Sequence, residues 1–188
     1  MEIRWHGRGG QGVWTVSNLL AEAAIKEGKY AQSFPTFGPE RMGAPIAAFT
    51  RISDSEIEIH SDIYEPDVVV VLDSTLVGYE DFISGLKSGG ALLINFRVDT
   101  SLTMLSKLIG KDLSSFNVYV VPATELALKT LGRGITNTAM LGALLSTTQV
   151  VRIESVEEVI RGRFRGPIAE KNIEVLREAY RCVRHVRE

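Results

Sequence analysis

The chain has 188 residues, 45% of them hydrophobic and 23% charged, which is the balance of a globular protein of about one domain. Its net charge of -2 gives no electrostatic reason to expect nucleic acid or an anionic membrane as a partner. No apolar run approaches the roughly 18–20 residues that cross a bilayer, and no charged leader precedes the first strand. We therefore expect a cytoplasmic protein.

The chain offers few residues that could hold a metal. Cys182 is the single cysteine, and one thiol cannot form an internal disulfide, a zinc site of several thiolates or a four-cysteine iron–sulfur cluster. His6, His60 and His185 show no metal-ligand spacing. We expect no metal site here, and any such centre to belong to another chain.

The first third of the sequence predicts a strand, a helix and a second strand. Residues 2–6 form the first strand, apolar residues at helical spacing predict a helix over 13–26, and residues 30–34 form the second strand. The prolines and glycines of residues 35–45 predict a long loop. Residues 46–61 alternate on both sides of a turn at 53–55, which predicts a β-hairpin with one wet face.

Three later segments are continuously apolar: DVVVVLD, ALLINF and VYVVPA. Such runs are typical of parallel strands that are buried on both faces. Segments that can be helical, 78–86 and 102–109, lie between them. The fold class we expect is therefore α/β, a three-layer, doubly wound, mostly parallel sheet with an antiparallel hairpin excursion.

The last part of the chain predicts helices. These are residues 136–145, a short turn over 156–160 that Ser155 caps with Glu158 at the capping-box spacing, and residues 168–186. We expect one domain over 1–188, with a core of about 1–150 and a helical C-terminal extension of about 151–188.

The glycine turn between the first strand and helix is the strongest motif. Its glycines satisfy G-x-G-x-x-G, with one more glycine inside the motif: Gly7, Gly9, Gly10 and Gly12. Such a turn lets the backbone approach a ligand, and free amides at the helix N-terminus favour an anion such as phosphate. Arg8 could add charge there, and Gln11 could hydrogen-bond the same ligand.

A dinucleotide-binding turn would require a second feature that this sequence lacks. It requires an acidic residue at the end of the second strand to bind the ribose, and the sequence there is QSFPTFG. Glu27 precedes that strand and is better explained as a surface residue at a helix end. Two interpretations stay open, a tight turn that only packs helix on sheet, and an anion-binding turn for another ligand.

Two further clusters are candidate contacts. Glu40 and Arg41 lie in the long loop, where Arg41 could face the ligand of the glycine turn or a partner, or the two could simply pair with each other. Asn137 and Thr138 follow the sequence GRGIT, and an N-cap at Thr136 or Asn137 would also explain them. His6 is better explained as a packed residue of the strand than as a base.

We find no nucleophile elbow, no Walker lysine and no paired carboxylates, so we assign no catalytic residue to this chain. The residues alone indicate a nucleotide-like binding or docking domain rather than a self-sufficient enzyme.

Several segments, taken in order, resemble one family. IRWHGRGGQG, GKYAQSFPTFGPERMGAPIAAFTRIS, PDVVVVLD, GLKSGG and RGITNTAMLGAL are similar to the gamma subunit of the 2-oxoacid:ferredoxin oxidoreductases, over nearly the whole chain. FGPERMGAP resembles the branch that acts on pyruvate and 2-oxoisovalerate.

The resemblance implies a subunit of an oligomeric enzyme that oxidatively decarboxylates a 2-oxoacid, pyruvate above all, and transfers the acyl group to coenzyme A. Thiamine diphosphate and [4Fe–4S] clusters would lie on alpha, beta and delta subunits, with ferredoxin as electron acceptor. The glycine turn, with Arg8, Arg41 and Gln11, would hold or screen the phosphates of coenzyme A. Two alternatives are a purely architectural docking subunit and a free-standing nicotinamide or flavin reductase, and the absent acid argues against the latter.

Overall fold

A computed structural model describes residues 1–36 and 42–187. In this part of the chain, the strands are β1 (Glu2–Arg8), β2 (Tyr30–Pro35), β3 (Pro45–Ser53), β4 (Val68–Val71), β5 (Ala91–Asn95), β6 (Asn117–Val121) and β7 (Arg184–His185). The helices are α1 (Val13–Lys26), the 3₁₀ turn η1 (Ser74–Leu76), α2 (Leu102–Ile109), α3 (Ala123–Leu131), α4 (Asn137–Thr148), α5 (Ile153–Arg163) and α6 (Pro167–Cys182).

The strands form one sheet in the order β2-β3-β1-β4-β5-β6-β7. β1, β4, β5 and β6 run parallel, with Trp5 opposite Val70 and Val70 opposite Leu93. β3 is antiparallel to both β1 and β2, and β7 is antiparallel to β6. The predicted α/β class, with a mostly parallel sheet and an antiparallel excursion, is confirmed.

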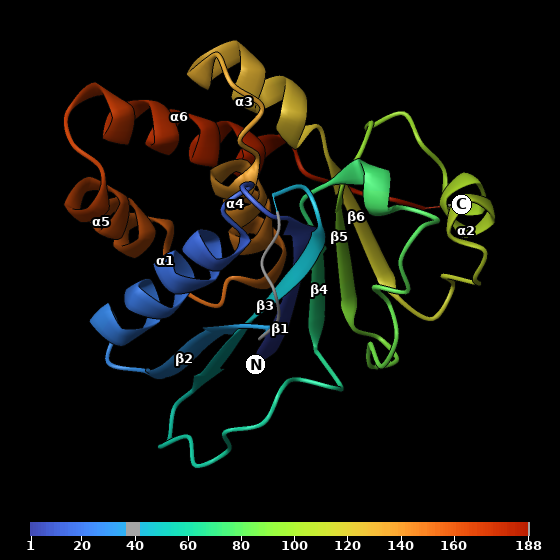
Figure 1. The fold of residues 1–188 in the computed structure, drawn as a ribbon, viewed down its shortest axis with the longest axis horizontal. Coiled ribbons are helices and arrows are strands. Elements are labelled where there is room, and N and C mark those ends of the chain that lie inside the picture. Colours follow the sequence, from blue (N-terminus) through green and yellow to red (C-terminus); the bar gives the residue numbers. More distant parts are fainter. Residues whose placement is uncertain (37–41, 188) are drawn as a thin grey trace.

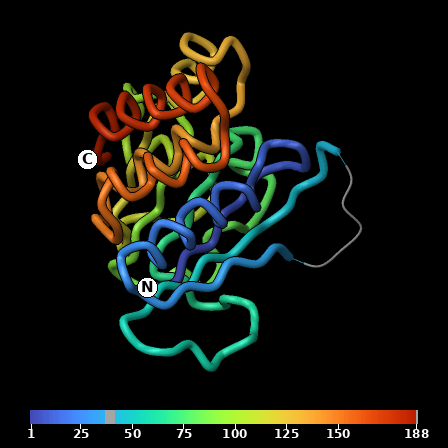
Figure 2. The backbone as a smooth tube through the Cα atoms, turned by 90° about the vertical axis from the view of Figure 1, so that its left-hand side faces the viewer, coloured from blue at the N-terminus to red at the C-terminus, as the bar shows by residue number. Residues whose placement is uncertain are grey.

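Helices cover the two faces of the sheet unequally. Figure 1 shows α1, α3, α4, α5 and α6 together on one side of the molecule and α2 on the other, and Figure 2 looks onto the thicker helical layer. The all-valine strand β4 is buried on both faces: Val68 and Val70 pack into the larger core, Val69 and Val71 into the smaller one. This is the burial that a continuous apolar run predicts.

The predicted hairpin over 46–61 is wrong in its second half. β3 forms, but its partners are β1 and β2, so both of its edges are already paired when the chain reaches Ser53. Residues 54–66 then form an irregular loop, and two of its carbonyl groups, those of Ile59 (3.2 Å) and Ser61 (3.3 Å), accept hydrogen bonds from Arg51. The antiparallel excursion is therefore the β2–β3 pair.

The predicted helix over 78–86 is also wrong. Residues 78–86 contain turns and no helix, and the short 3₁₀ turn η1 ends before them at Leu76. Phe82, Ile83 and Leu86 lie in the smaller core. Conversely, α3 begins at Ala123, directly after β6, although the apolar run VYVVPA predicts a strand there.

The prediction for α5 is wrong in its cap. The helix begins at Ile153, and Glu27 at the end of α1 caps it, accepting from the Arg152 N–H (2.7 Å) and from the Ser155 hydroxyl (2.7 Å). Glu27 therefore joins two helices instead of standing on the surface. Glu158 pairs with Lys26 (3.1 Å), not with the helix start.

The last predicted helix is too long. α6 ends at Cys182, and the chain then pairs with the open edge of β6 as β7, with His185 opposite Tyr119. α5 and α6 contribute Val156, Ile160 and Leu176 to the same core as α1.

Candidate ligand site at the glycine turn

The glycine turn lies where the strand order of the sheet reverses direction. From β1 the chain passes through α1 to the β2–β3 side, whereas β4, β5 and β6 follow one another on the other side. In open α/β sheets, ligands bind outside the carboxyl ends of the strands at such a point. The carboxyl ends of β1, at Arg8, and β4, at Val71, flank it here.

Part of the turn's backbone is already paired. The Gly9 N–H donates to the Ala44 carbonyl (2.9 Å), and the Gly9 carbonyl accepts from the Gly43 N–H (3.0 Å). The Gln11 N–H donates to the Arg8 carbonyl (3.1 Å). Within the described residues, the amides of Gly10 and Gly12 have no acceptor.

Two helices begin side by side at this turn, as Figure 1 shows for α1 and α4. Gly12 is the N-cap of α1 with φ of 73°, a left-handed conformation that favours glycine. Its carbonyl accepts from Asn137 Nδ2 (3.4 Å), and a Cβ on Gly12 would lie 2.4 Å from that nitrogen. The structure thus brings two of the predicted clusters, the glycine turn and Asn137, into contact.

Thr138 takes a different position. It is buried, its backbone N–H donates to Asn137 Oδ1 (2.8 Å), and its hydroxyl donates to Asn172 Oδ1 of α6 (2.8 Å). The N-cap of α4 is Thr136, as one of the two predicted possibilities, but its hydroxyl donates to the Leu72 carbonyl (3.1 Å) instead of capping the helix.

Arg8 and Gln11 meet an acidic residue that the sequence analysis missed. Gln11 Nε2 donates to Asp73 Oδ2 (2.5 Å), and Arg8 Nε lies 3.4 Å from the same oxygen. Arg8 also donates to the Thr75 hydroxyl (3.0 Å) and to the Gly43 carbonyl (3.1 Å). These side chains tie the end of β1 to the segment that follows β4.

Asp73 is held as a carboxylate. Burial raises the pKa of its carboxyl group, but hydrogen bonds from Thr75 and Gln11 and the charge of Arg8 outweigh burial, so the pKa lies below its usual value. One signal could have revealed this residue, since Asp73 ends the buried run DVVVVLD and the carboxyl ends of neighbouring parallel strands meet at one edge.

Two predicted site residues, Glu40 and Arg41, lie outside the described residues. The next residue, Met42, is 88% exposed, and its sulfur packs against Gly10, where a Cβ would lie 2.5 Å away. Trp14 in the first turn of α1 is 50% exposed. An exposed apolar rim of Trp14 and Met42 therefore borders the turn.

His6 is a packed strand residue, as predicted. Its Nε2 accepts from Arg4 Nε (3.0 Å), and burial together with the charge of Arg4 lowers its pKa to about 3. The ring is neutral at physiological pH and is committed as an acceptor.

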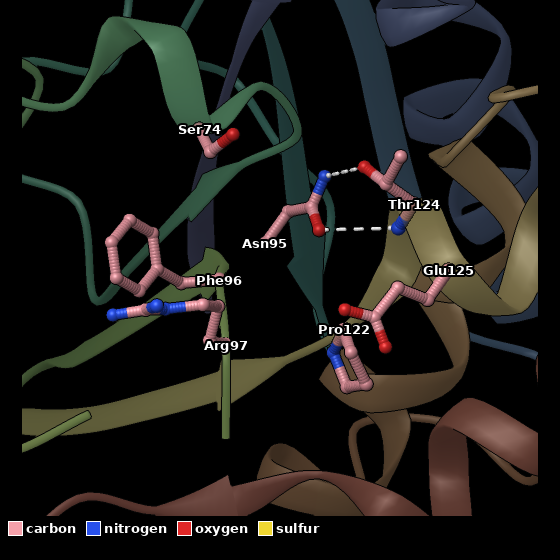
Figure 3. Close-up of a pocket in the computed structure, with 7 residues that line it drawn as sticks. All are labelled: Ser74, Asn95, Phe96, Arg97, Pro122, Thr124 and Glu125. Carbon is pink, nitrogen blue, oxygen red and sulfur yellow. Dashed lines mark hydrogen bonds between the residues drawn. The ribbon is translucent and has the colours of Figure 1, made fainter. Parts of the chain in front are cut away.

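A pocket lies at the carboxyl ends of β5 and β6, as Figure 3 shows. Its floor is Asn95, whose Nδ2 donates to the Thr124 hydroxyl (2.8 Å) and whose Oδ1 accepts from the Thr124 N–H (3.2 Å). Arg97 and Glu125 stand on its two sides, and Ser74, the neighbour of Asp73, lies on its rim. The amide of Asn95 is fully used within the protein.

Within residues 1–36 and 42–187, no group of three or more His, Cys, Asp or Glu side chains could hold a metal ion. None of the helices described is long and apolar enough to span a membrane.

Comparison with known proteins decides the family. The model of the pyruvate ferredoxin/flavodoxin oxidoreductase family matches residues 2–182. The chain belongs to this family. It is 52% identical to the pyruvate/ketoisovalerate oxidoreductases common subunit gamma of Thermococcus litoralis, over 96% of this chain and 95% of the relative. It is 46% identical to pyruvate synthase subunit PorC of Methanothermobacter thermautotrophicus strain Delta H, over 100% of this chain and 98% of the relative.

Solved structures agree. The pyruvate oxidoreductase subunit PORC of Thermotoga maritima superposes with a TM-score of 0.85 at 40% identity, covering 98% of this chain and 97% of that one. A 2-oxoglutarate:ferredoxin oxidoreductase from Magnetococcus marinus shares the fold at 21% identity, with a TM-score of 0.78, and this chain covers 30% of it.

The family member described here is a gamma-type subunit of a multi-subunit 2-oxoacid:ferredoxin oxidoreductase, as the resemblance implied. The redox activity is therefore a property of the assembled complex.

Proposed function

We propose that the glycine turn of this subunit binds the phosphate groups of coenzyme A in an enzyme that converts pyruvate, coenzyme A and oxidised ferredoxin into acetyl-coenzyme A, CO₂ and reduced ferredoxin. Thiamine diphosphate and [4Fe–4S] clusters lie on companion alpha, beta and delta subunits in this proposal. The solved oxidoreductase from Magnetococcus marinus, which contains a domain of this fold, has coenzyme A bound.

The observation that carries the proposal is the meeting of two helix N-termini at the switch point. Gly12 caps α1 and contacts Asn137, the first residue of α4, so the positive ends of two helix dipoles lie close together. The amides of Gly10 and Gly12, which have no acceptor within the described residues, lie in the same turn. Backbone amides and helix N-termini suit phosphate oxygens.

The topology beside β1 speaks against a classical dinucleotide. In that fold, the strand next to β1 is parallel to it and ends with the acid that binds the ribose. Here β3 occupies this place and runs antiparallel, with Pro45 opposite Arg8. A phosphate ligand without a ribose carboxylate fits this arrangement better than NAD or FAD.

Under this proposal the chain acts by position. The turn fixes the phosphates of coenzyme A, so that its thiol end reaches the acyl group on a companion subunit with less loss of translational freedom. No residue of this chain donates or removes a proton in the reaction.

We expect that replacing Arg8 with Ala in the assembled enzyme, and separately Arg41 with Ala, raises the KM for coenzyme A by about 10-fold or more. One charge-assisted hydrogen bond to phosphate contributes roughly 1.5–3 kcal/mol, which sets this scale. The KM for pyruvate should not change. The measurement is 2-oxoacid-dependent dye reduction under anaerobic conditions.

The control is Arg181→Ala, which removes an exposed arginine from the last turn of α6. An unchanged KM for coenzyme A in both the Arg8 and Arg41 variants would reject the proposed site.

A docking role is the second candidate, and the exposed rim of Trp14 and Met42 favours it. Large apolar side chains at a surface often mark contacts between subunits. A docking contact and a ligand contact differ in outcome, since loss of the first weakens assembly and loss of the second weakens coenzyme A binding alone.

A further inference from the structure

Asp73 occupies the two side chains that the proposed phosphate site would use. Its Oδ2 accepts from Gln11 Nε2 (2.5 Å) and lies 3.4 Å from Arg8 Nε. Its Oδ1 accepts from the backbone N–H (2.8 Å) and the hydroxyl (2.7 Å) of Thr75. Both carboxylate oxygens are therefore held, Oδ1 by Thr75 and Oδ2 by the side chains of the glycine turn.

The hydrogen-bond polarity of this cluster is fixed. The Arg8 backbone N–H donates to Gln11 Oε1 (2.8 Å), so the amide of Gln11 must present its NH₂ group to Asp73. Position 73 consequently needs an acceptor, and the carboxylate also neutralises Arg8. An arginine and an amide NH₂ group are thus directed at one oxygen. If Asp73 were absent, an oxygen of an anionic ligand could accept from the same two groups.

We propose that Asp73 is an internal competitor for the anion, a carboxylate that occupies Arg8 and Gln11 until a phosphate group displaces it. The inference rests on the proposed function, since it concerns the same ligand. Binding of coenzyme A exchanges the Arg8–Asp73 contact for a contact between Arg8 and phosphate. Asp73 thereby sets the affinity of the turn and keeps weakly bound anions out.

The charge of Asp73 is always present when the enzyme works. The pKa of its carboxyl group lies below the usual value, so pH does not relieve the competition near neutrality. An uncompensated negative charge a few ångströms from a phosphate opposes binding strongly in a partly buried site. Removing that charge should strengthen binding, even though it also removes hydrogen bonds.

The experiment compares Asp73→Asn with Asp67→Asn in the assembled enzyme and in the isolated full chain. Asp67 and Asp73 flank β4 at opposite ends, and Asp67 also has a lowered pKa, an ion pair with Lys87 (2.6 Å) and a backbone hydrogen bond from Glu2 (2.7 Å). We expect Asp73→Asn to lower the dissociation constant of coenzyme A about 10-fold. Asp67→Asn should leave it unchanged.

Arg8→Ala distinguishes a failure of the competition by Asp73 from a failure of the proposed coenzyme A site. If Arg8→Ala weakens coenzyme A binding while Asp73→Asn leaves it unchanged or weakens it, the competition is refuted and the proposed function stands. If neither variant changes binding, the turn is not the coenzyme A site and both fall.

Should Asp73→Asn fail to fold, the wild-type chain provides the test. Inorganic pyrophosphate is titrated into the ¹⁵N-labelled full chain, and the signals of Arg8 Nε–H and the Gln11 side-chain amide are followed. Displacement of Asp73 predicts that both signals shift with one saturation curve, while the Lys87 ammonium signal stays in place. Saturable binding without a shift at Arg8 and Gln11 would overturn the inference.

Discussion

His6 illustrates how a single side chain can set the acid stability of this subunit. The residue accepts from Arg4, which in turn donates to the Phe82 carbonyl (2.9 Å), so the ring lies between a guanidinium group and the smaller core. If the imidazole were protonated, its Nε2 could no longer accept from Arg4, and the ring would carry a positive charge beside that of the guanidinium group. The folded chain therefore binds a proton at His6 far less readily than the unfolded chain does.

We expect this difference to destabilise the protein in acid. The folded pKa is about 3 and the ordinary value is 6.5, so only the unfolded chain takes up the proton between these values. The free energy of unfolding should fall by about 1.4 kcal/mol per pH unit from this residue as pH drops through that window. Chemical denaturation of wild type and His6→Gln between pH 7 and 4 measures the effect, and the variant should show a shallower decline. Equal slopes would show that His6 does not contribute.

Some residues of the candidate site were predictable from the sequence and others were not. The glycine spacing identified the turn, and the helix start at residues 136–137 was found as well, because both depend on neighbours along the chain. Asp73 was missed because it is about 60 residues from the glycine turn in sequence. It comes close to the turn only because β4, which it follows, pairs with β1 in the sheet. The dinucleotide pattern places the acid after the second strand, whereas here Asp73 follows β4.

The helices α4 and α6 pack tightly against each other. A Cβ on Gly142 of α4 would lie 2.0 Å from the Leu176 carbonyl oxygen of α6, so glycine allows the two backbones to touch. α4 is buried along nearly its whole length, which explains why it has no polar stripe and why its small residues cluster.

Replacing Gly142 with Ala should lower the free energy of unfolding by about 2–4 kcal/mol, because the helices must separate. Gly162 of α5 gives the matched control, since nothing lies within 4 Å of its missing Cβ. Gly162→Ala should stabilise the protein by roughly 0.5–1 kcal/mol through helix propensity. Denaturant melts of both variants provide the measurement, and similar effects of the two would contradict this account of the packing.

The elements that were predicted wrongly depend on contacts between segments that are distant in sequence. α1 and α2 were predicted correctly because local periodicity and caps define them. The second arm of the expected hairpin fails because β1 and β2 already occupy both edges of β3, which only the assembled sheet determines. The cap of α5 comes from Glu27, 125 residues before Arg152, and no local pattern contains it.

For the molecule as a whole, the order of strand and helix segments was enough to predict the class. A strand–turn–helix start followed by three continuously apolar segments allows few other architectures, because parallel strands that are buried on both faces need helical cover. Antiparallel additions at β3 and β7 depend on which strand edge is open, and so they could not be placed from the sequence.

The two tryptophans of the chain offer a test of docking in the assembled enzyme. Trp5 is fully buried and donates to the Thr50 hydroxyl (3.0 Å), whereas Trp14 is half exposed beside the glycine turn. If this chain alone is labelled with 5-fluorotryptophan, we expect ¹⁹F spectra in which assembly shifts the Trp14 signal and leaves the Trp5 signal in place. Assignment uses Trp14→Phe. A Trp14 signal that assembly does not change would show that the rim stays outside the subunit contacts.

The joint core of α1 with α5 and α6 has a consequence for synthesis of the chain. Leu19 and Leu20 of α1 belong to the same core as Val156, Ile160 and Leu176, so the core that the first helix enters is complete only when the last two helices have been made. A nascent chain emerging from the ribosome therefore carries a core that is incompletely covered for most of the time needed for translation. We therefore expect the growing polypeptide to be prone to aggregation until the last helices have been made.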